Sequence, residues 1–295
     1  IDFDYASEEI KKSLTAKFQN KGGNVLEKNL VAISKACDSI TEVEIKGKYT
    51  EVDENVNLDM FQKLDKRLGN SLPVSSFINQ SDGKTNPSQS SLEKRFASTV
   101  APVCNKENCM MCNMCSIVCP HSVIRPYLLD DIEYAKAPQS IKDRCLDTKI
   151  SGINYHFLVM SSIADCTGCG LCESICPGKK GVKAITMESV ETLRSTGYIE
   201  DLNYLEENVS KKEPMNRFTI KGSQFVEPKI KFPGACAGCG ETPYLKLMSQ
   251  LFGEGLVVAN ATGCSSIYSA SYPSTAYSSP WANSLFEDNA EFGYG

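Results

Sequence analysis

The chain has 295 residues, of which 41% are hydrophobic, and a formal net charge of −5. This length allows two or more domains with hydrophobic cores, and the acidic balance gives no reason to expect nucleic-acid or membrane binding. No apolar run reaches the roughly 18 to 20 residues of a membrane span. The sequence has no signal peptide and begins at Ile1, so we expect an internal piece of a longer protein.

The N-terminal fifth of the chain reads as helices followed by a strand. Apolar residues recur every four positions over residues 5–19, and a second apolar stripe, which includes Cys37, runs over residues 25–40. These spacings predict two amphipathic helices, with Cys37 as a buried core thiol. Alternation at residues 43–45 predicts a short strand, and the apolar spacing over residues 58–68 predicts another helix.

The rest of the chain alternates between linker, cysteine-rich and helical segments. Residues 79–91 are polar and rich in turn formers, which is typical of a linker. Residues 188–215 are charged and contain two short apolar stripes that predict helices. Farther on, residues 245–252 predict a helix, and residues 256–260 predict a buried strand.

Two cysteine runs carry the strongest chemical signal. Each has the spacing C-x2-C-x2-C-x3-C-P, which is the bacterial ferredoxin pattern. Three closely spaced thiolates can bind one [4Fe–4S] cluster, and the fourth, turned away by the proline, binds the other cluster. The spacing therefore assigns one cluster to Cys109, Cys112, Cys115 and Cys176, and the second to Cys166, Cys169, Cys172 and Cys119.

Two alternatives compete with these clusters. Structural zinc also binds C-x2-C pairs, and fourteen cysteines could form disulfides in a secreted chain. The repeated four-cysteine pattern with its proline favours clusters over both. Cys104 and Cys145 fall outside the pattern, so we do not expect them to be ligands. His121 and Arg125 follow the first run and could tune a cluster potential or be purely structural.

A third cysteine group lies downstream. Cys236 and Cys239 form a C-x2-C pair, and Cys264 follows in NATGCSS. Three thiolates are one short of the set that a [4Fe–4S] cluster needs. Spacing alone leaves a zinc site and an incomplete cluster open.

Several segments resemble one enzyme family over nearly the whole chain. They are GNSLPVSSF, LEKRFASTVAPVC, CNMCSIVCPHSVIRP, DCTGCGLCESICPGK, FPGACAGCGETPY, NATGCSSIY and WANSLFEDNAEFGYG. The sequence is similar to pyruvate:ferredoxin (flavodoxin) oxidoreductase and to pyruvate:NADP oxidoreductase. The resemblance implies a multidomain protein of α/β and α+β type, in which a two-[4Fe–4S] ferredoxin-like domain precedes the start of a thiamine diphosphate-binding α/β domain. The implied divisions are 1–47 (end of an α/β domain), 48–86 (small connecting domain), 87–209 (ferredoxin-like) and 210–295 (start of the thiamine domain).

The resemblance also assigns the third cysteine group. Cys236, Cys239 and Cys264 match three ligands of a third [4Fe–4S] cluster beside the thiamine, here called the proximal cluster. Its fourth ligand is expected beyond Gly295. Glu241 and Cys264 match positions that contact thiamine diphosphate, although Glu241 could also be a helix N-terminal acid that favours the helix dipole. A Gly-Asp-Gly motif for Mg2+ and diphosphate is absent from the sequence, so this cofactor site is expected to be incomplete.

The activity implied by the resemblance is the oxidative decarboxylation of pyruvate with coenzyme A. Electrons would pass through the clusters to ferredoxin or flavodoxin, or to a fused NADPH reductase in the NADP-linked form. The expected full-length protein is a homodimer in the cytoplasm or in a hydrogenosome-like organelle, and this piece alone is expected to be inactive. Another 2-oxo acid as substrate and a non-catalytic electron carrier remain alternatives, but a carrier does not need residues 232–295.

Overall fold

The structure is a computed structural model that describes residues 2–21, 24–39, 41–42, 59–80, 89–261, 263–269, 275–279, 281–284 and 294. The chain divides into two compact units, Ile1–Asn57 and Leu58–Gly295. The three finer boundaries implied by the resemblance stay a prediction. No helix within the described residues is both long enough and apolar enough to cross a lipid bilayer.

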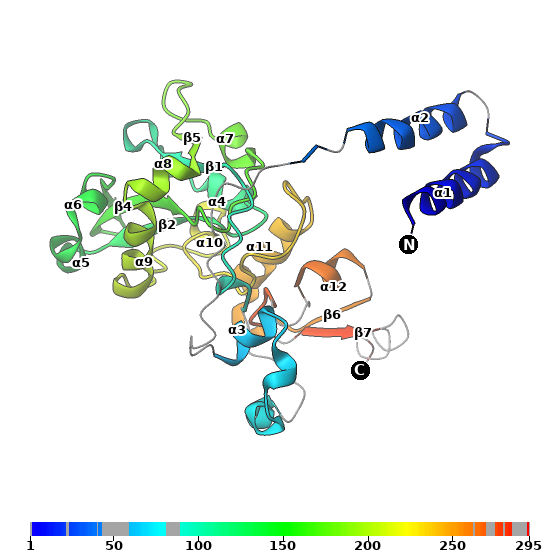
Figure 1. Ribbon diagram of the computed structural model, residues 1–295. Helices are drawn as coiled ribbons and strands as arrows, with labels where there is room; N and C mark the ends of the chain where they lie inside the picture. Colours follow the sequence, from blue (N-terminus) through cyan, green and yellow to red (C-terminus); the bar gives the residue numbers. More distant parts are fainter. Residues whose placement is uncertain are drawn as a thin grey trace. The chain divides into compact units, whose positions relative to one another are not determined.

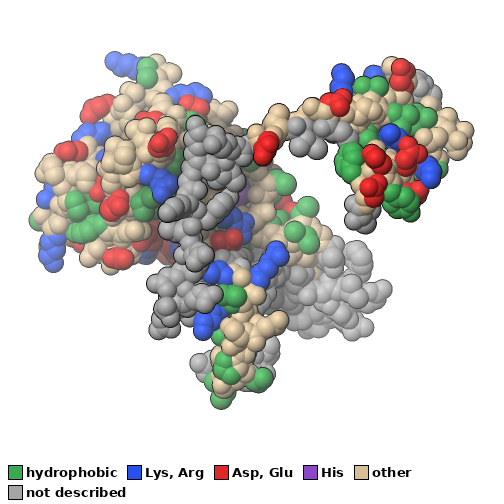
Figure 2. Space-filling view, in the orientation of Figure 1, with side chains coloured by type: hydrophobic (Ala, Val, Ile, Leu, Met, Phe, Trp, Pro, Cys, Tyr) green, Lys and Arg blue, Asp and Glu red, His purple; other side chains and the backbone are tan. Residues whose placement is uncertain are grey.

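The first unit contains a pair of contacting helices, α1 (Phe3–Phe18) and α2 (Val25–Asp38), close to the two ranges predicted from the apolar stripes. Asp2 caps α1 by accepting the Tyr5 N–H at 3.1 Å. No residue of α1 is buried, and Figure 2 shows hydrophobic side chains on the surface of the pair. The Cys37 side chain and the strand predicted at residues 43–45 lie outside the described residues.

The second unit begins with short helical turns. Helix α3 (Met60–Asp65) starts with a capping box, because Asp59 accepts the Gln62 N–H while the Gln62 side chain accepts the Asp59 N–H. It ends earlier than the helix predicted over residues 58–68. The 3-10 turns η1 (Gly69–Ser71), η2 (Val74–Gln80) and η3 (Gln89–Ser91) follow it.

Two small antiparallel sheets organise the cysteine-rich region (Figure 1). Strand β1 (Val100–Cys104) pairs with β5 (Ile185–Ser189), and β4 (Ile153–Ser161) lies between β2 (Ile124–Leu129) and β3 (Leu146–Ile150). Each cysteine run therefore lies between a strand of one sheet and a strand of the other. The first run follows β1 and precedes β2, whereas the second follows β4 and precedes β5.

Short helices complete this region. The first run is preceded by the 3-10 turn η4 (Lys106–Asn108). The two runs contain α4 (Met114–Val118) and α7 (Leu171–Ile175), respectively. The insertion between the runs includes α5 (Asp131–Lys136), α6 (Gln139–Lys142) and β3. Helices α8 (Val190–Ser195) and α9 (Tyr198–Asn208) confirm the two stripes predicted in residues 188–215. Two hydrophobic clusters form the core, and both include cysteines of the runs.

The last part of the chain adds three helices and a parallel pair of strands among the described residues. Helices α10 (Ile220–Ser223) and α11 (Thr242–Phe252) are followed by the turn η5 (Gly253–Gly255). Strand β6 (Val258–Ala261) pairs in parallel with β7 (Trp281–Ser284), and α12 (Cys264–Ser269) lies between them in the sequence. The mixed α/β character agrees with the expected fold class, while the ferredoxin-like and thiamine-binding domain types stay predictions.

Candidate metal centres

The two cysteine runs have the same backbone course. In each, the second residue after the first cysteine has a positive φ, Met111 at 54° and Gly168 at 67°. The residue before the short helix of each run also has a positive φ, which is 62° at Asn113 before α4 and 73° at Gly170 before α7. Such left-handed residues turn the chain sharply, so successive cysteine side chains of one run can face a common centre.

Two small cavities show which cysteines lie together. Three cysteines of one run and the last cysteine of the other line each cavity. The first cavity is lined by Cys109, Cys112, Cys115 and Cys176. The second is lined by Cys119, Cys166, Cys169 and Cys172. The fold thus brings the cysteines together in the same two sets of four that the spacing assigns.

Backbone amides point at four of these sulfur atoms. The first cysteine of each run accepts an N–H two residues ahead, Met111 to Cys109 at 3.4 Å and Gly168 to Cys166 at 3.3 Å. The last cysteine of each run accepts one as well, from Val123 at 3.3 Å in one run and from Ala184 at 3.3 Å in the other. Amide donors stabilise negative charge on sulfur, so they favour thiolate ligands.

Three of the thiols around the cavities do not ionise easily by themselves. Burial and the charges of neighbouring cysteines together raise the pKa of Cys166 to about 11 and the pKa of Cys172 to about 12, although a backbone N–H opposes the rise at each sulfur atom. Burial likewise raises the pKa of Cys115. Several thiolates can share one cavity only when cations neutralise their charge, which metal ions would provide.

The grouping does not resemble a site for one metal ion. Within the described residues, no three His, Cys, Asp or Glu side chains converge closely enough to hold a single ion. All cysteines with a described side chain are free of disulfides. Four thiols spread around one cavity instead match the donor set of a [4Fe–4S] cluster.

The third cysteine group lies near the start of α11. Cys236 is exposed, and the backbone N–H groups of Thr242 and Glu241 lower the pKa of Cys239 overall, although burial opposes them. Cys264 begins α12 and is exposed. Glu241 stands at the N-terminus of α11, where its side chain makes no capping hydrogen bond.

Tyr268 joins this group and was not singled out from the sequence, although it ends the NATGCSSIY segment. Burial raises its pKa first, and the nearby charges of Glu241, Cys239 and Cys264 raise it further. Tyr268 thus shares one neighbourhood with Glu241 and two cysteines of the third group.

The third group also packs against the second run. A side chain added at Gly238 would lie 3.8 Å from Cβ of Cys169. The His121 ring, two residues after Cys119, contacts the carbonyl oxygen of Ala235 through Nε2 at 2.9 Å. The loop that carries Cys236 and Cys239 therefore lies beside the second cavity.

The two remaining cysteines of this region line neither cavity. A hydrogen bond between the Cys104 thiol and the Cys109 sulfur contributes most to lowering the pKa of Cys109, against the effect of burial, and it raises the pKa of Cys104. Cys145 donates instead to the carbonyl oxygen of Ile141 at 3.3 Å, inside the hydrophobic core.

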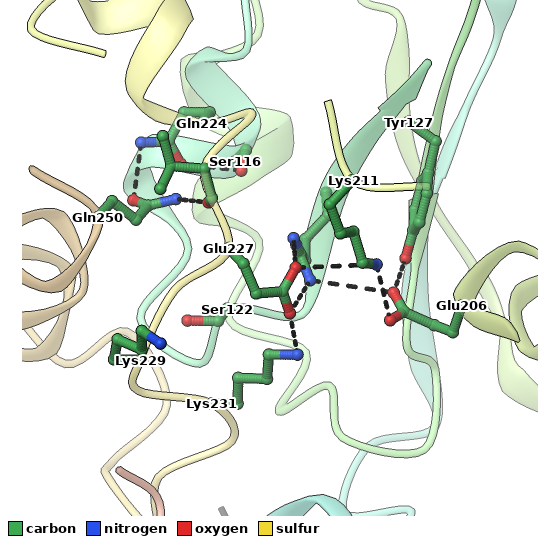
Figure 3. A network of polar contacts seen from close by, with 12 residues as sticks. Ser116, Ser122, Tyr127, Glu206, Lys211, Gln224, Glu227, Lys229, Lys231 and Gln250 are labelled. Carbon is green, nitrogen blue, oxygen red and sulfur yellow. Dashed lines mark hydrogen bonds and ion pairs between the residues drawn. The ribbon is translucent and has the colours of Figure 1, made fainter. Parts of the chain in front are cut away.

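Arg125 belongs to a network of ion pairs. Its guanidinium binds both carboxylate oxygens of Glu227, with Nη1 2.8 Å from Oε1. Lys231 also pairs with Glu227, and Tyr127 donates to Glu206 (Figure 3). The network borders a cavity of about 410 Å3. These contacts favour the structural alternative for Arg125.

A second buried polar cluster joins α11 to α4. The Ser116 hydroxyl donates to Gln224 at 2.9 Å, and Gln224 donates to Gln250 at 3.1 Å (Figure 3). The Lys246 ammonium donates to the carbonyl oxygens of Ser116, Ile117 and Cys119. Sequence patterns do not indicate this contact, because Lys246 lies in an ordinary amphipathic helix.

Comparison with known proteins places the whole chain beside one enzyme family. No family model matches it. It is 39% identical over 313 residues to the pyruvate-flavodoxin oxidoreductase of Klebsiella pneumoniae and 40% identical over 315 residues to the pyruvate:ferredoxin oxidoreductase of Moorella thermoacetica. Both alignments cover 100% of this chain and 26% of the relative. The pyruvate dehydrogenase [NADP(+)] of Cryptosporidium parvum is 35% identical over 338 residues, which cover 17% of that protein.

Proposed function

We propose that this chain, which corresponds over its whole length to a stretch of the pyruvate:ferredoxin (flavodoxin) oxidoreductases, carries the electron-transfer part of such an enzyme. Two [4Fe–4S] clusters would occupy the two cysteine-lined cavities. Cys109, Cys112, Cys115 and Cys176 would hold cluster 1, and Cys166, Cys169, Cys172 and Cys119 would hold cluster 2. The single observation that carries this proposal is the lining of each cavity by three cysteines of one run and one of the other.

The protein's task at these clusters is to hold them close together and to set their potentials. Backbone N–H groups on four sulfur atoms would stabilise the more negative, reduced state. The cavity walls also include apolar side chains, which limit solvent access. Because each run contributes to both cavities, the clusters would be close neighbours, which suits electron transfer between them.

The third cysteine group would bind the proximal cluster. Cys236, Cys239 and Cys264 supply three thiols, and a fourth ligand would come from elsewhere in the full-length protein. Thiamine diphosphate, when bound, supplies the carbanion-stabilising chemistry that releases CO2 from a 2-oxo acid. Glu241 and Tyr268 lie where they could orient that cofactor beside Cys264. The missing Mg2+–diphosphate motif fits a chain that forms only one side of the site.

The packing between the groups supports a direction for the proposed electron route. The loop of Cys236 and Cys239 lies beside Cys169 and next to His121, so the proximal cluster would be nearest to cluster 2. Electrons would therefore pass from the third group to cluster 2 and then to cluster 1. From cluster 1 they would leave for an external acceptor.

For the whole enzyme we propose that pyruvate and coenzyme A give acetyl-CoA, CO2, two electrons and one proton. The two bacterial relatives are named for flavodoxin and ferredoxin, and these carriers are the proposed acceptors. The similarity to the Cryptosporidium parvum protein keeps a fused NADP-linked acceptor as a second candidate. The chain spans about a quarter of the length of the two bacterial relatives, and substrate recognition would lie largely outside it.

The test uses the full-length protein, prepared without oxygen. Pyruvate and coenzyme A should reduce the clusters, as seen by electron paramagnetic resonance, and should release labelled CO2. Changing Cys239 to Ser should abolish reduction by pyruvate and leave the two clusters reducible by dithionite. Changing Cys145 to Ser is the matched control and should alter neither result. Zinc in place of iron at the two runs would overturn the proposal.

A further inference from the structure

Lys246 is a lysine whose side chain is withdrawn from solvent. Only 2% of the residue is exposed. It lies in α11, shortly after the Cys236 and Cys239 pair of the third group, and reaches the end of α4 in the first cysteine run. There Nζ lies 3.1 Å from the carbonyl oxygen of Ile117 and 3.2 Å from that of Cys119, and it also contacts the carbonyl oxygen of Ser116.

The number of acceptors matches the charged form of Lys246, and burial, which opposes that form, lowers its pKa only to about 8. A protonated amine has three N–H groups, and a neutral amine has two. Three carbonyl oxygens surround Nζ, so each proton of the ammonium has one acceptor. These carbonyl groups are at the end of a short helix, where carbonyl oxygens lack partners inside the helix.

The charge has no carboxylate partner among the described residues. The charged groups that act on Lys246 are Cys119, Arg125 and Cys115. Arg125 is already paired with Glu227. A buried charge is normally compensated by an opposite charge. As cluster ligands, the sulfur atoms of Cys119 and Cys115, one from each cavity, would be the anionic groups that compensate Lys246.

We propose that Lys246 is a built-in counter-cation that sets the reduction potentials of clusters 1 and 2. This inference rests on the proposed function, because it needs the two clusters in their cavities. Reduction adds negative charge to a cluster, and a fixed cation in a water-poor interior stabilises that charge. Lys246 therefore raises both potentials. The effect is larger on cluster 2, because Nζ contacts the backbone of its ligand Cys119 directly.

The position of Lys246 adds a consequence for the electron route. The same helix follows the loop of Cys236 and Cys239, which lies beside cluster 2. A higher potential at cluster 2 favours electron transfer from the proximal cluster into the pair. Lys246 is thus a positioning and potential-setting residue that acts through the backbone and the charge of the cluster ligands.

The test is a redox titration of the full-length protein, followed by electron paramagnetic resonance. In Lys246→Met, the reduced-to-oxidised ratio of cluster 2 at a fixed potential should fall at least tenfold, which is a shift of about 59 mV for one electron. The shift of cluster 1 should be smaller. Lys246→Gln keeps hydrogen-bond donors without the charge and should shift the same way, whereas Lys246→Arg should stay near the wild-type potentials.

Two controls separate charge from packing. Lys149→Met removes an exposed lysine of β3, where solvent screens the charge, and should leave both potentials unchanged. Gln250→Leu disturbs the buried cluster beside Lys246 without removing a charge and should also leave them unchanged. Unchanged potentials in both neutral Lys246 variants would overturn the inference. Loss of iron from both would also count against it, because Lys246 would then be a folding residue. Absence of the two clusters from the wild-type protein would instead refute the proposed function.

Discussion

Gly238 packs against Cys169, although the two residues belong to different cysteine groups. A Cβ atom at Gly238 would be 3.8 Å from Cβ of Cys169 and 3.9 Å from Cδ1 of Leu171. Gly238 also has a φ of 72°, a conformation that residues with a Cβ atom adopt only at a cost of about 1 kcal/mol or more. The contact therefore requires glycine because of its backbone conformation, and not because a Cβ atom would lack room.

This contact predicts an electron-transfer defect. In the full-length protein, Gly238→Val should displace the loop of Cys236 and Cys239 from cluster 2, because a β-branched residue is strained at this φ. Reduction of the paired clusters by pyruvate should slow at least several-fold, while dithionite should reduce them as before. Gly240→Ala is the matched control, since nothing lies within 4 Å of its added Cβ. Equal rates in rapid-mixing experiments for both variants would argue against the proposed route.

The crossed cysteine sets predict which cluster each substitution damages. Cys176→Ser should alter the spectrum of the cluster held by Cys109, and Cys119→Ser should alter that of the cluster held by Cys166, because each lines the other run's cavity. Wild-type protein should contain about eight irons in these two clusters. Cys104→Ser should keep them all, since serine can still donate to Cys109. The pairing is wrong if each substitution damages the cluster of its own run.

The ion pair between Arg125 and Glu227 predicts a pH-dependent contribution to stability. Arg125 and Lys231 lower the pKa of Glu227 to about 2 against the opposing effect of burial. A carboxyl group with a lowered pKa stabilises the folded protein at any pH above its ordinary pKa of about 4.5. This contribution is lost as the pH falls toward the folded-state pKa of about 2. Glu227→Gln should therefore cost about 2 to 3 kcal/mol at pH 7. The difference from wild type should shrink between pH 4.5 and 2.

Denaturant unfolding followed by circular dichroism, with variant and wild type side by side, measures this difference. The control is Glu213→Gln, which removes an exposed pair with Arg217 at 2.6 Å and should cost only about 0.3 to 0.5 kcal/mol. A difference in unfolding free energy between Glu227→Gln and wild type that stays constant down to pH 2 would contradict the assigned pKa shift.

The chain by itself should transfer electrons without turning over substrate. It spans 26% of the length of its bacterial relatives, and in the proposed assignment it would supply three thiols to a cluster that needs four ligands. The expressed 295-residue chain should accept electrons from dithionite into two clusters and should bind thiamine diphosphate weakly or not at all. Release of CO2 from labelled pyruvate by this chain alone would refute that expectation. Activity of the full-length protein on a different 2-oxo acid would correct the substrate only.

The sequence alone determined the local features of this protein. Cysteine spacing is a short-range property, so the two runs, their trailing prolines and their left-handed turns follow from neighbouring residues. Apolar periodicity likewise predicted α1, α2, α8, α9 and α11, because each of these helices has an apolar face that repeats along the chain. The short segments that resemble the oxidoreductase family then predict the proposed role of the third cysteine group.

Only the tertiary structure decided how the third cysteine group lies relative to the two runs. Contacts such as Gly238 with Cys169 and His121 with Ala235 join residues far apart in the chain, and no periodicity encodes them. Tyr268 and Lys246 were missed for the same reason. A tyrosine in a short motif and a lysine in an amphipathic helix are ordinary in sequence, and they gain a role only when folding removes them from water beside charged groups. The cost of burying a charge without a partner makes Lys246 informative, and that burial is visible only in the folded chain.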